Sequence, residues 1–275
     1  MVFMATRSTN RSPGLTKDKL DEAVSLLKSA HANMQKGNFD RAIVDFKGML
    51  AINKDYAPAH FGLGLAYNEK GDAKKSIKEL KRAIELDPDV VQPRTSLALV
   101  YLNLDKPKDA ERELEGAVEV GKKDTESRFY LANVYYMNGK SDEAVAILKE
   151  ALKLDPMFSD ARYNLGILYM AMGQRSKAIK ELLKAIELDP DDIDARRNLA
   201  KAYIGQEKYG LAQEQLDIVL LESPKDQEAR DLLDDLDKEE KAEQKSVKPK
   251  PKAKAIKGKV VKKVAKPKPK AKVKK

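Results

Sequence analysis

The chain has 275 residues, of which 35% are charged, and it contains neither Cys nor Trp. The lack of Cys excludes disulfide bonds, thiol catalysis and a lipid-modified cysteine as a membrane anchor. The chain has no run of about 18 apolar residues, and its first twenty residues lack the apolar core of a signal peptide. We therefore expect a cytoplasmic protein without a transmembrane segment.

The net charge of +9 is unevenly distributed along the chain. Residues 246–275 contain 14 of the 53 basic residues and none of the 44 acidic residues, which leaves 39 basic residues against 44 acidic ones before them. An asymmetry of this kind predicts two parts with different partners.

Taken in order, the chain begins with a polar stretch, residues 1–16, that is predicted to be disordered. Residues 17–226 are predicted to form an array of helical repeats. Residues 227–243 follow as a charged helix with Leu232, Leu233 and Leu236 on one face, which indicates a cap over the end of the array. Residues 244–275 are rich in Lys, Pro and Ala, and this composition is typical of a disordered tail.

The array repeats every 34 residues. Tyr169 has counterparts at Tyr67, Tyr101, Tyr135 and Tyr203. Within residues 159–192, two runs of apolar residues with helical spacing are separated by Gly173 and closed by Pro190. This unit is therefore predicted to be an antiparallel helix pair. The predicted units are residues 23–56, 57–90, 91–124, 125–158, 159–192 and 193–226.

The unit resembles the tetratricopeptide repeat. The matching residues are Leu165, Gly166, Tyr169, Ala178, Leu182, Ala185 and Pro190. Arg162 stands where that family usually has an aromatic residue. The resemblance implies an all-α, right-handed superhelical solenoid of about six helix-turn-helix repeats with a C-terminal capping helix. It also implies that the first helix of each pair lines the concave face, and that the protein is an interaction scaffold or assembly factor.

No pattern in the sequence indicates an enzyme. His31 and His60 lie in different repeats without ligand-like spacing, and Gly62 and Gly64 lack the fingerprint of a phosphate-binding loop. We expect no catalytic residues, no metal site and no cofactor.

The predicted concave face carries apolar residues at positions that the repeat pattern leaves free. A solvent-facing helix surface is usually polar, so these residues indicate a groove for a partner peptide or amphipathic helix. The alternative is that some of them pack within or between repeats. The residues predicted to line the groove are Phe61, Leu65, Leu99, Leu102, Phe129, Asn133, Tyr136, Met137, Tyr163, Ile167 and Met170.

Three further series of residues each have a functional and a structural interpretation. The tyrosines could stack on bases, but packing between helices is the favoured interpretation. Asn133, Asn164 and Asn198 match part of a carboxylate-binding pattern of the family, whereas Phe129 and Asp194 stand where Lys is needed. Finally, Arg94, Arg128, Arg162 and Arg196, with His60 in register, could bind an acidic partner; the favoured alternative places their charged groups in water.

The tail supports a second hypothesis, an adaptor anchored to DNA, RNA or an anionic surface. Lysines without acidic neighbours bind polyanions through counterion release. The tail could also bind the acidic body of another copy, and self-association through the groove is a further possibility. The residues predicted to bind polyanions are Lys248, Lys250, Lys252, Lys254, Lys257, Lys259, Lys262, Lys263, Lys266, Lys268, Lys270, Lys272, Lys274 and Lys275.

Overall fold

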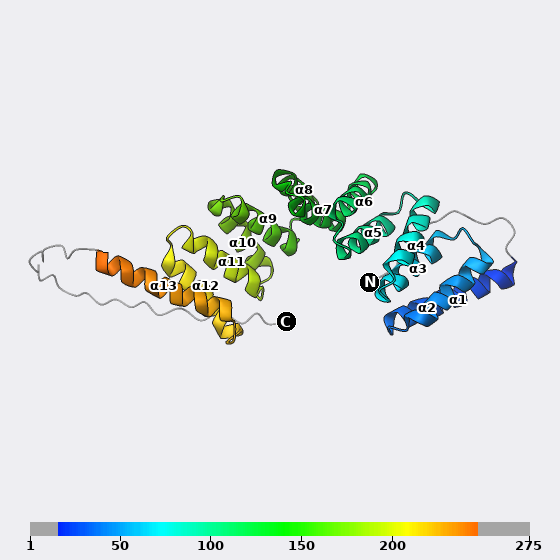
Figure 1. Cartoon of the computed structure of the whole chain (residues 1–275), viewed down its shortest axis with the longest axis horizontal. Helices are drawn as coiled ribbons and strands as arrows, with labels where there is room; N and C mark the ends of the chain where they lie inside the picture. The colour runs from blue at the N-terminus through cyan, green and yellow to red at the C-terminus, as the bar shows by residue number, and fades with distance from the viewer. Residues whose placement is uncertain (1–15, 247–275) are drawn as a thin grey trace, which may run out of the picture.

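The computed structural model describes residues 16–246, which form thirteen helices and no strand. They follow one another in an arch, with α5 to α8 at its middle (Figure 1). The helices are α1 (Lys17–Gln35), α2 (Phe39–Ile52), α3 (Ala57–Glu69), α4 (Ala73–Leu86), α5 (Val91–Asn103), α6 (Pro107–Val120), α7 (Thr125–Met137), α8 (Ser141–Leu154), α9 (Ser159–Ala171), α10 (Arg175–Leu188), α11 (Ile193–Ile204), α12 (Tyr209–Glu222) and α13 (Gln227–Ser246). The all-α solenoid predicted from the repeat is confirmed.

Successive helices pack in pairs, and each pair contacts the next one along the chain. The helices α3, α5, α7, α9 and α11 begin exactly one repeat length apart, at residues 57, 91, 125, 159 and 193. First helices of neighbouring pairs also touch each other, as α3 does with α5 and α5 with α7. At the middle of the arch, α5 and α7 lie on the inner side and α6 and α8 on the outer side (Figure 1). The inner, concave face is therefore built from first helices.

The pair α9 and α10 shows why the repeat residues form this unit. Leu165 and Tyr169 of α9 and Leu182 of α10 are all buried. A Cβ atom added to Gly166 would lie 2.7 Å from Cγ of Leu182, so the close approach of the two helices requires a residue without a side chain.

Every pair turns through one residue with positive φ. This residue is Gly173 between α9 and α10, with φ of 70°, and the N–H of Gln174 then donates to the carbonyl of Tyr169 at 2.8 Å. The two repeats that lack glycine keep the same turn, with φ of 54° at Asp105 and 59° at Glu207. The left-handed conformation is therefore imposed on these two residues by the packing of the helices on either side.

The ends of the array differ from its middle. Helix α1 begins after Thr16, whose hydroxyl accepts a hydrogen bond from the N–H of Lys19. Helix α13 covers α12 through the buried residues Ala229 and Leu236, and it extends three residues beyond the predicted end at residue 243. Glu243, Gln244 and their neighbours are good helix formers, and the next helix-breaking residue is Pro249. Residues 1–15 and 247–275, where disorder was predicted, lie outside the described residues.

Candidate docking surface on the concave face

We call the ten apolar residues predicted for the groove the concave strip: Phe61, Leu65, Leu99, Leu102, Phe129, Tyr136, Met137, Tyr163, Ile167 and Met170. All ten come from the first helices α3, α5, α7 and α9. Tyr136 and Met137, at the end of α7, are 45% and 56% exposed. The other eight are half-buried. The strip is therefore most open to solvent at the middle of the arch.

Several members of the concave strip also hold repeats together. The ring centroid of Phe129 lies 5.3 Å from that of Phe158 and 5.7 Å from that of Tyr130. Tyr163 and Met170 pack against the core shared by α10 to α13. Phe61 and Leu102 pack in the same way against the core around α5. These side chains are half-buried, so Tyr136 and Met137 are the most exposed members of the concave strip.

Asparagine side chains bridge neighbouring helices on this face. Nδ2 of Asn164 donates a 2.7 Å hydrogen bond to Oδ1 of Asn133, which joins α9 to α7. Nδ2 of Asn198 lies 3.2 Å from the hydroxyl of Tyr163 and 2.9 Å from the carbonyl of Asp194. The three asparagines considered for carboxylate binding are therefore engaged with the chain itself.

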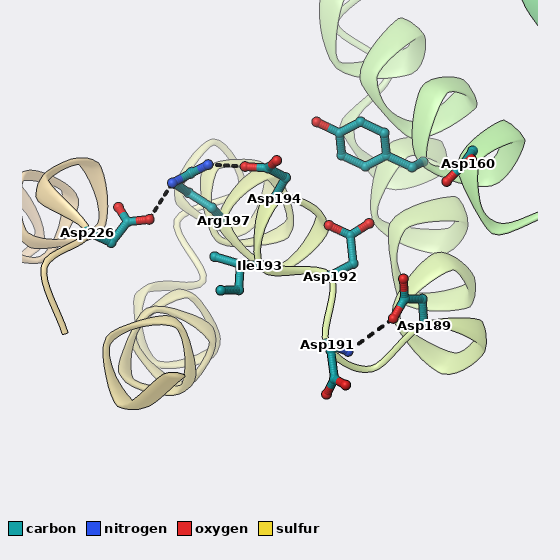
Figure 2. Close-up of a pocket in the computed structure, with 9 residues that line it drawn as sticks. Asp160, Asp189, Asp191, Asp192, Ile193, Asp194, Arg197 and Asp226 are labelled. Atoms are coloured by element: carbon teal, nitrogen blue, oxygen red, sulfur yellow. Dashed lines mark hydrogen bonds and ion pairs between the residues drawn. The ribbon is translucent and has the colours of Figure 1, made fainter. Parts of the chain in front are cut away.

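An open pocket of about 550 Å³ lies where α9, α11 and the start of α13 meet. Arg197 stands in it between Asp194 and Asp226 (Figure 2), and it also lies 2.8 Å from Oε2 of Glu228. Tyr163 belongs both to this pocket and to the concave strip. The lining residues are Asp160, Tyr163, Asp189, Asp191, Asp192, Ile193, Asp194, Arg197 and Asp226. This pocket was not predicted from the sequence, although the acidic run DPDDID at residues 189–194 was a signal for it.

The aspartates of this pocket have roles in the fold as well. Oδ1 of Asp192 accepts the N–H of Ala195 at 2.8 Å and caps α11. Oδ1 of Asp226 accepts the N–H of Ala229 at 2.8 Å at the start of α13. Carboxylates are favoured at helix N-termini, so α9, α11 and α13 bring their acidic N-terminal ends to one place.

The expectation for the arginine series was wrong in both of its forms. The arginines neither form a free ladder for an acidic partner nor keep their charged groups in water. Nη1 of Arg128 donates to the carbonyls of Gly121 and Asp124 at 3.0 and 2.8 Å, and its side chain is only 9% exposed. Nη2 of Arg196 donates to the carbonyl of Pro190 at 2.7 Å. The side chains of Arg128, Arg162 and Arg196 turn back onto the loop before their own helix, whereas Nη1 of Arg94 lies 3.5 Å from Oε2 of Glu113 on α6.

The tyrosine series is structural, as favoured from the sequence. Tyr67, Tyr101, Tyr169 and Tyr203 are buried in the core clusters. Tyr135 is partly exposed, and its hydroxyl donates to Oε1 of Glu115 at 3.1 Å. Four of the five rings are thus shielded from any stacking partner.

Within residues 16–246, no group of His, Asp and Glu residues is arranged to hold a metal ion. No helix in that part of the chain combines the length and the apolar character needed to cross a membrane. The fourteen lysines predicted to bind polyanions lie outside the described residues.

Comparison with known proteins defines the family. Two tetratricopeptide repeat profiles match the chain, one over residues 33–100 and the other over residues 132–173 and 168–206. The chain belongs to the tetratricopeptide repeat family. No curated protein sequence matches it.

Solved structures of the same architecture agree with this assignment. A crystal structure of MamA is 27% identical, with a TM-score of 0.57, covering 62% of this chain and 92% of MamA. YrrB, described as a TPR protein with an unusual peptide-binding site, is 28% identical with a TM-score of 0.54, over 65% of this chain and 92% of YrrB. PilF of Pseudomonas aeruginosa is 14% identical with a TM-score of 0.68, over 80% of this chain and all of PilF, and shows the fold alone.

Proposed function

We propose that this protein is a non-enzymatic interaction scaffold whose concave strip binds a partner peptide or an amphipathic helix. The observation that carries this proposal is the exposure of Tyr136 and Met137 at the end of α7, a helix on the inner side of the arch (Figure 1). Large apolar side chains exposed together on a helix that is otherwise well packed mark a surface for another molecule. An aromatic ring beside a flexible methionine suits an apolar anchor residue of a partner.

The relatives support the same function. YrrB is described as having a peptide-binding site, and most of its length aligns with this chain. The tyrosines and arginines that recur along the array are consistent with this proposal. The buried tyrosines and the arginines that donate to loop carbonyls are engaged within the fold, which leaves the exposed apolar residues of the first helices as candidate contacts.

The test is site-specific photocrosslinking in living cells. A photoreactive phenylalanine analogue replaces Met137 on the inner face or, as the control, Ala146, an exposed residue of α8 in the same repeat. We expect a crosslinked partner from position 137 and none from position 146. Equal crosslinking from both positions, or none from 137 in cells that contain the native interaction network, would contradict the proposal.

A second function is supported by the charge distribution. Fourteen lysines and no acidic residue in residues 246–275 favour binding to nucleic acid or another polyanion. A chain ending at Ser246 keeps all the helices of the described residues and removes these lysines. We expect the full chain, but not the shortened one, to bind a DNA duplex at low salt, with affinity falling steeply as salt rises. Equal DNA binding by both chains would exclude the tail as the contact.

A further inference from the structure

The concave face changes character towards its C-terminal end. Its middle is apolar around Tyr136 and Met137, and beyond Tyr163 it opens into the acidic pocket. Among the described residues, the carboxylates of Asp160, Asp189, Asp191 and Asp192 have no ion-pair partner, while Arg197 is already shared by Asp194, Asp226 and Glu228. An occupant that covers this end of the face must therefore combine apolar side chains with positive charge.

The chain itself contains a segment with this chemistry. Residues 255–265 read AIKGKVVKKVA, in which Ile256, Val260, Val261 and Val264 alternate with four lysines. The flanking sequences, PKPKAK and KPKPKAK, lack such bulky apolar residues. Segment 255–265 is thus the part of the basic tail that has both the apolar side chains to cover the concave strip and the lysines to pair with the acidic pocket.

The connection is long enough for this segment to reach the pocket. Helix α13 has 20 residues, about 30 Å at 1.5 Å per residue, and Asp226 of the pocket immediately precedes it. Residues 247–254 span up to about 28 Å when extended. Segment 255–265 can therefore run back beside α13 and arrive at Arg197 and Asp192 without unfolding any helix.

We propose that segment 255–265 of the same chain occupies the C-terminal end of the concave face. Its lysines face the unpaired aspartates of the pocket, and its valines and isoleucine cover the apolar surface at Tyr163 and Ile193. This inference rests on the proposed function, because it makes the tail a resident competitor that an external partner must displace. Since the competitor is tethered, its effective concentration is in the millimolar range.

The test uses a fluorescent synthetic peptide of residues 255–265 and measures its anisotropy with two full-length proteins. One is the natural chain, and the other carries glutamine in place of the segment's lysines: Lys257→Gln, Lys259→Gln, Lys262→Gln and Lys263→Gln. We expect the variant to bind the peptide about tenfold more tightly or better, because its own segment no longer competes. Equal affinities would overturn the proposal.

The second arm tests the pocket in the background of that lysine variant. Asp189→Asn with Asp191→Asn is expected to weaken peptide binding about threefold to tenfold and to reduce its dependence on salt. The matched control is Asp87→Asn with Asp89→Asn, the same positions of an Asp-Pro-Asp loop three repeats earlier. Equal effects of the two pairs would show that the pocket is not the contact. All variants are checked for unchanged helical content by circular dichroism.

Two outcomes separate this inference from the proposed function. If the peptide does not bind while position 137 still crosslinks to a partner, only the tail inference fails. If the natural chain forms oligomers that the lysine variant does not form, the segment binds a second copy and the intramolecular contact is excluded. Failure of crosslinking at position 137 would remove the proposed function, whatever the peptide does.

Discussion

Nη1 of Arg162 lies 3.1 Å from Oε2 of Glu181, and Nη2 of the same arginine donates to the carbonyl of Pro156 at 2.7 Å. The arginine thereby ties the loop before α9 to the body of α10. His60 makes the equivalent contacts, with its Nδ1 2.7 Å from Oε2 of Glu79 and its Nε2 2.9 Å from the carbonyl of Lys54. In these two repeats, a nitrogen-bearing side chain at the same position therefore joins the preceding loop to the second helix of its own pair.

Replacing Arg162 with alanine should destabilise the array. The change leaves the half-buried carboxylate of Glu181 and the Pro156 carbonyl without their main donor, so we expect the free energy of unfolding to fall by about 1.5–3 kcal/mol. Urea denaturation followed by circular dichroism measures the change. The control is Arg112→Ala, because Arg112 is 72% exposed and pairs only with Asp109 one turn away; its cost should stay below about 0.5 kcal/mol. Similar losses of stability in both variants would show that Arg162 does not stabilise the array by joining the loop before α9 to α10.

Glycine should stabilise the two helix turns that lack it, at Asp105 and Glu207. Asp105 and Glu207 adopt positive φ, a conformation that costs an ordinary residue about 1 kcal/mol. We expect Asp105→Gly to raise the free energy of unfolding by about 0.5–1 kcal/mol. Gly173→Ala should have the opposite effect and lower the stability. The added Cβ meets no atom within 4 Å, so the loss should come from the positive φ of the backbone alone. Thermal unfolding of both variants measures these changes in stability. A loss of stability in Asp105→Gly would refute the prediction.

Gly62 and Phe46 form a coupled pair between the first and second repeats. Phe46 is buried, and a Cβ atom on Gly62 would overlap its ring. Gly62→Ala should therefore cost about 1–3 kcal/mol of stability. Leucine occupies the position of Phe46 in the later repeats, as at Leu80 and Leu182. We expect Phe46→Leu to rescue Gly62→Ala in a double-mutant cycle, whereas additive effects of the two changes would exclude the coupling.

The stability of the array should fall in alkali through Tyr135. Burial raises the pKa of this phenol from 10.0 to about 12, and its hydrogen bond to the Glu115 carboxylate adds to the shift. The neutral phenol is favoured in the folded state, so the unfolded state loses its proton first as the pH rises. This contribution to stability is complete below pH 10 and is lost between about pH 10 and 12.

The measurement compares urea unfolding of the natural chain and Tyr135→Phe across that pH range. The phenylalanine variant should lose less stability, since it has no phenol to ionise. Glu115→Gln removes the neighbouring charge and should give an intermediate slope. Identical pH slopes for all three proteins would show that Tyr135 does not contribute.

The repeat could be predicted from sequence because its determinants are local. Gly173, Pro190 and the apolar spacing between them act within 34 residues, and the same pattern recurs along the chain. The turn at Asp105 lies one repeat length after the turn at Gly71 and one before the turn at Gly139, so its place follows from the register of the repeat. The charged face of α13 indicated a cap, and only its end was misplaced, because good helix formers continue to Ser246.

The contacts and burial of individual side chains could not be predicted in this way, because they depend on how the helices pack against one another. Arg162 and Glu181 are 19 residues apart, and their pairing requires α9 and α10 to be packed with the preceding loop beside them. Phe129 and Tyr136 look alike on a helical pattern, yet only the packing of Phe158 against Phe129 makes one half-buried and leaves the other exposed.

The sequence by itself determined the family, the helix pairs and the separation of a basic tail from an acidic body. The tertiary structure decided which residues remain for a partner. Asp160, Asp192 and Asp226 each start a different helix, and only the stacking of successive repeats brings those acidic N-termini into one pocket. A local pattern specifies a helix pair, whereas a shared surface depends on how neighbouring pairs are placed.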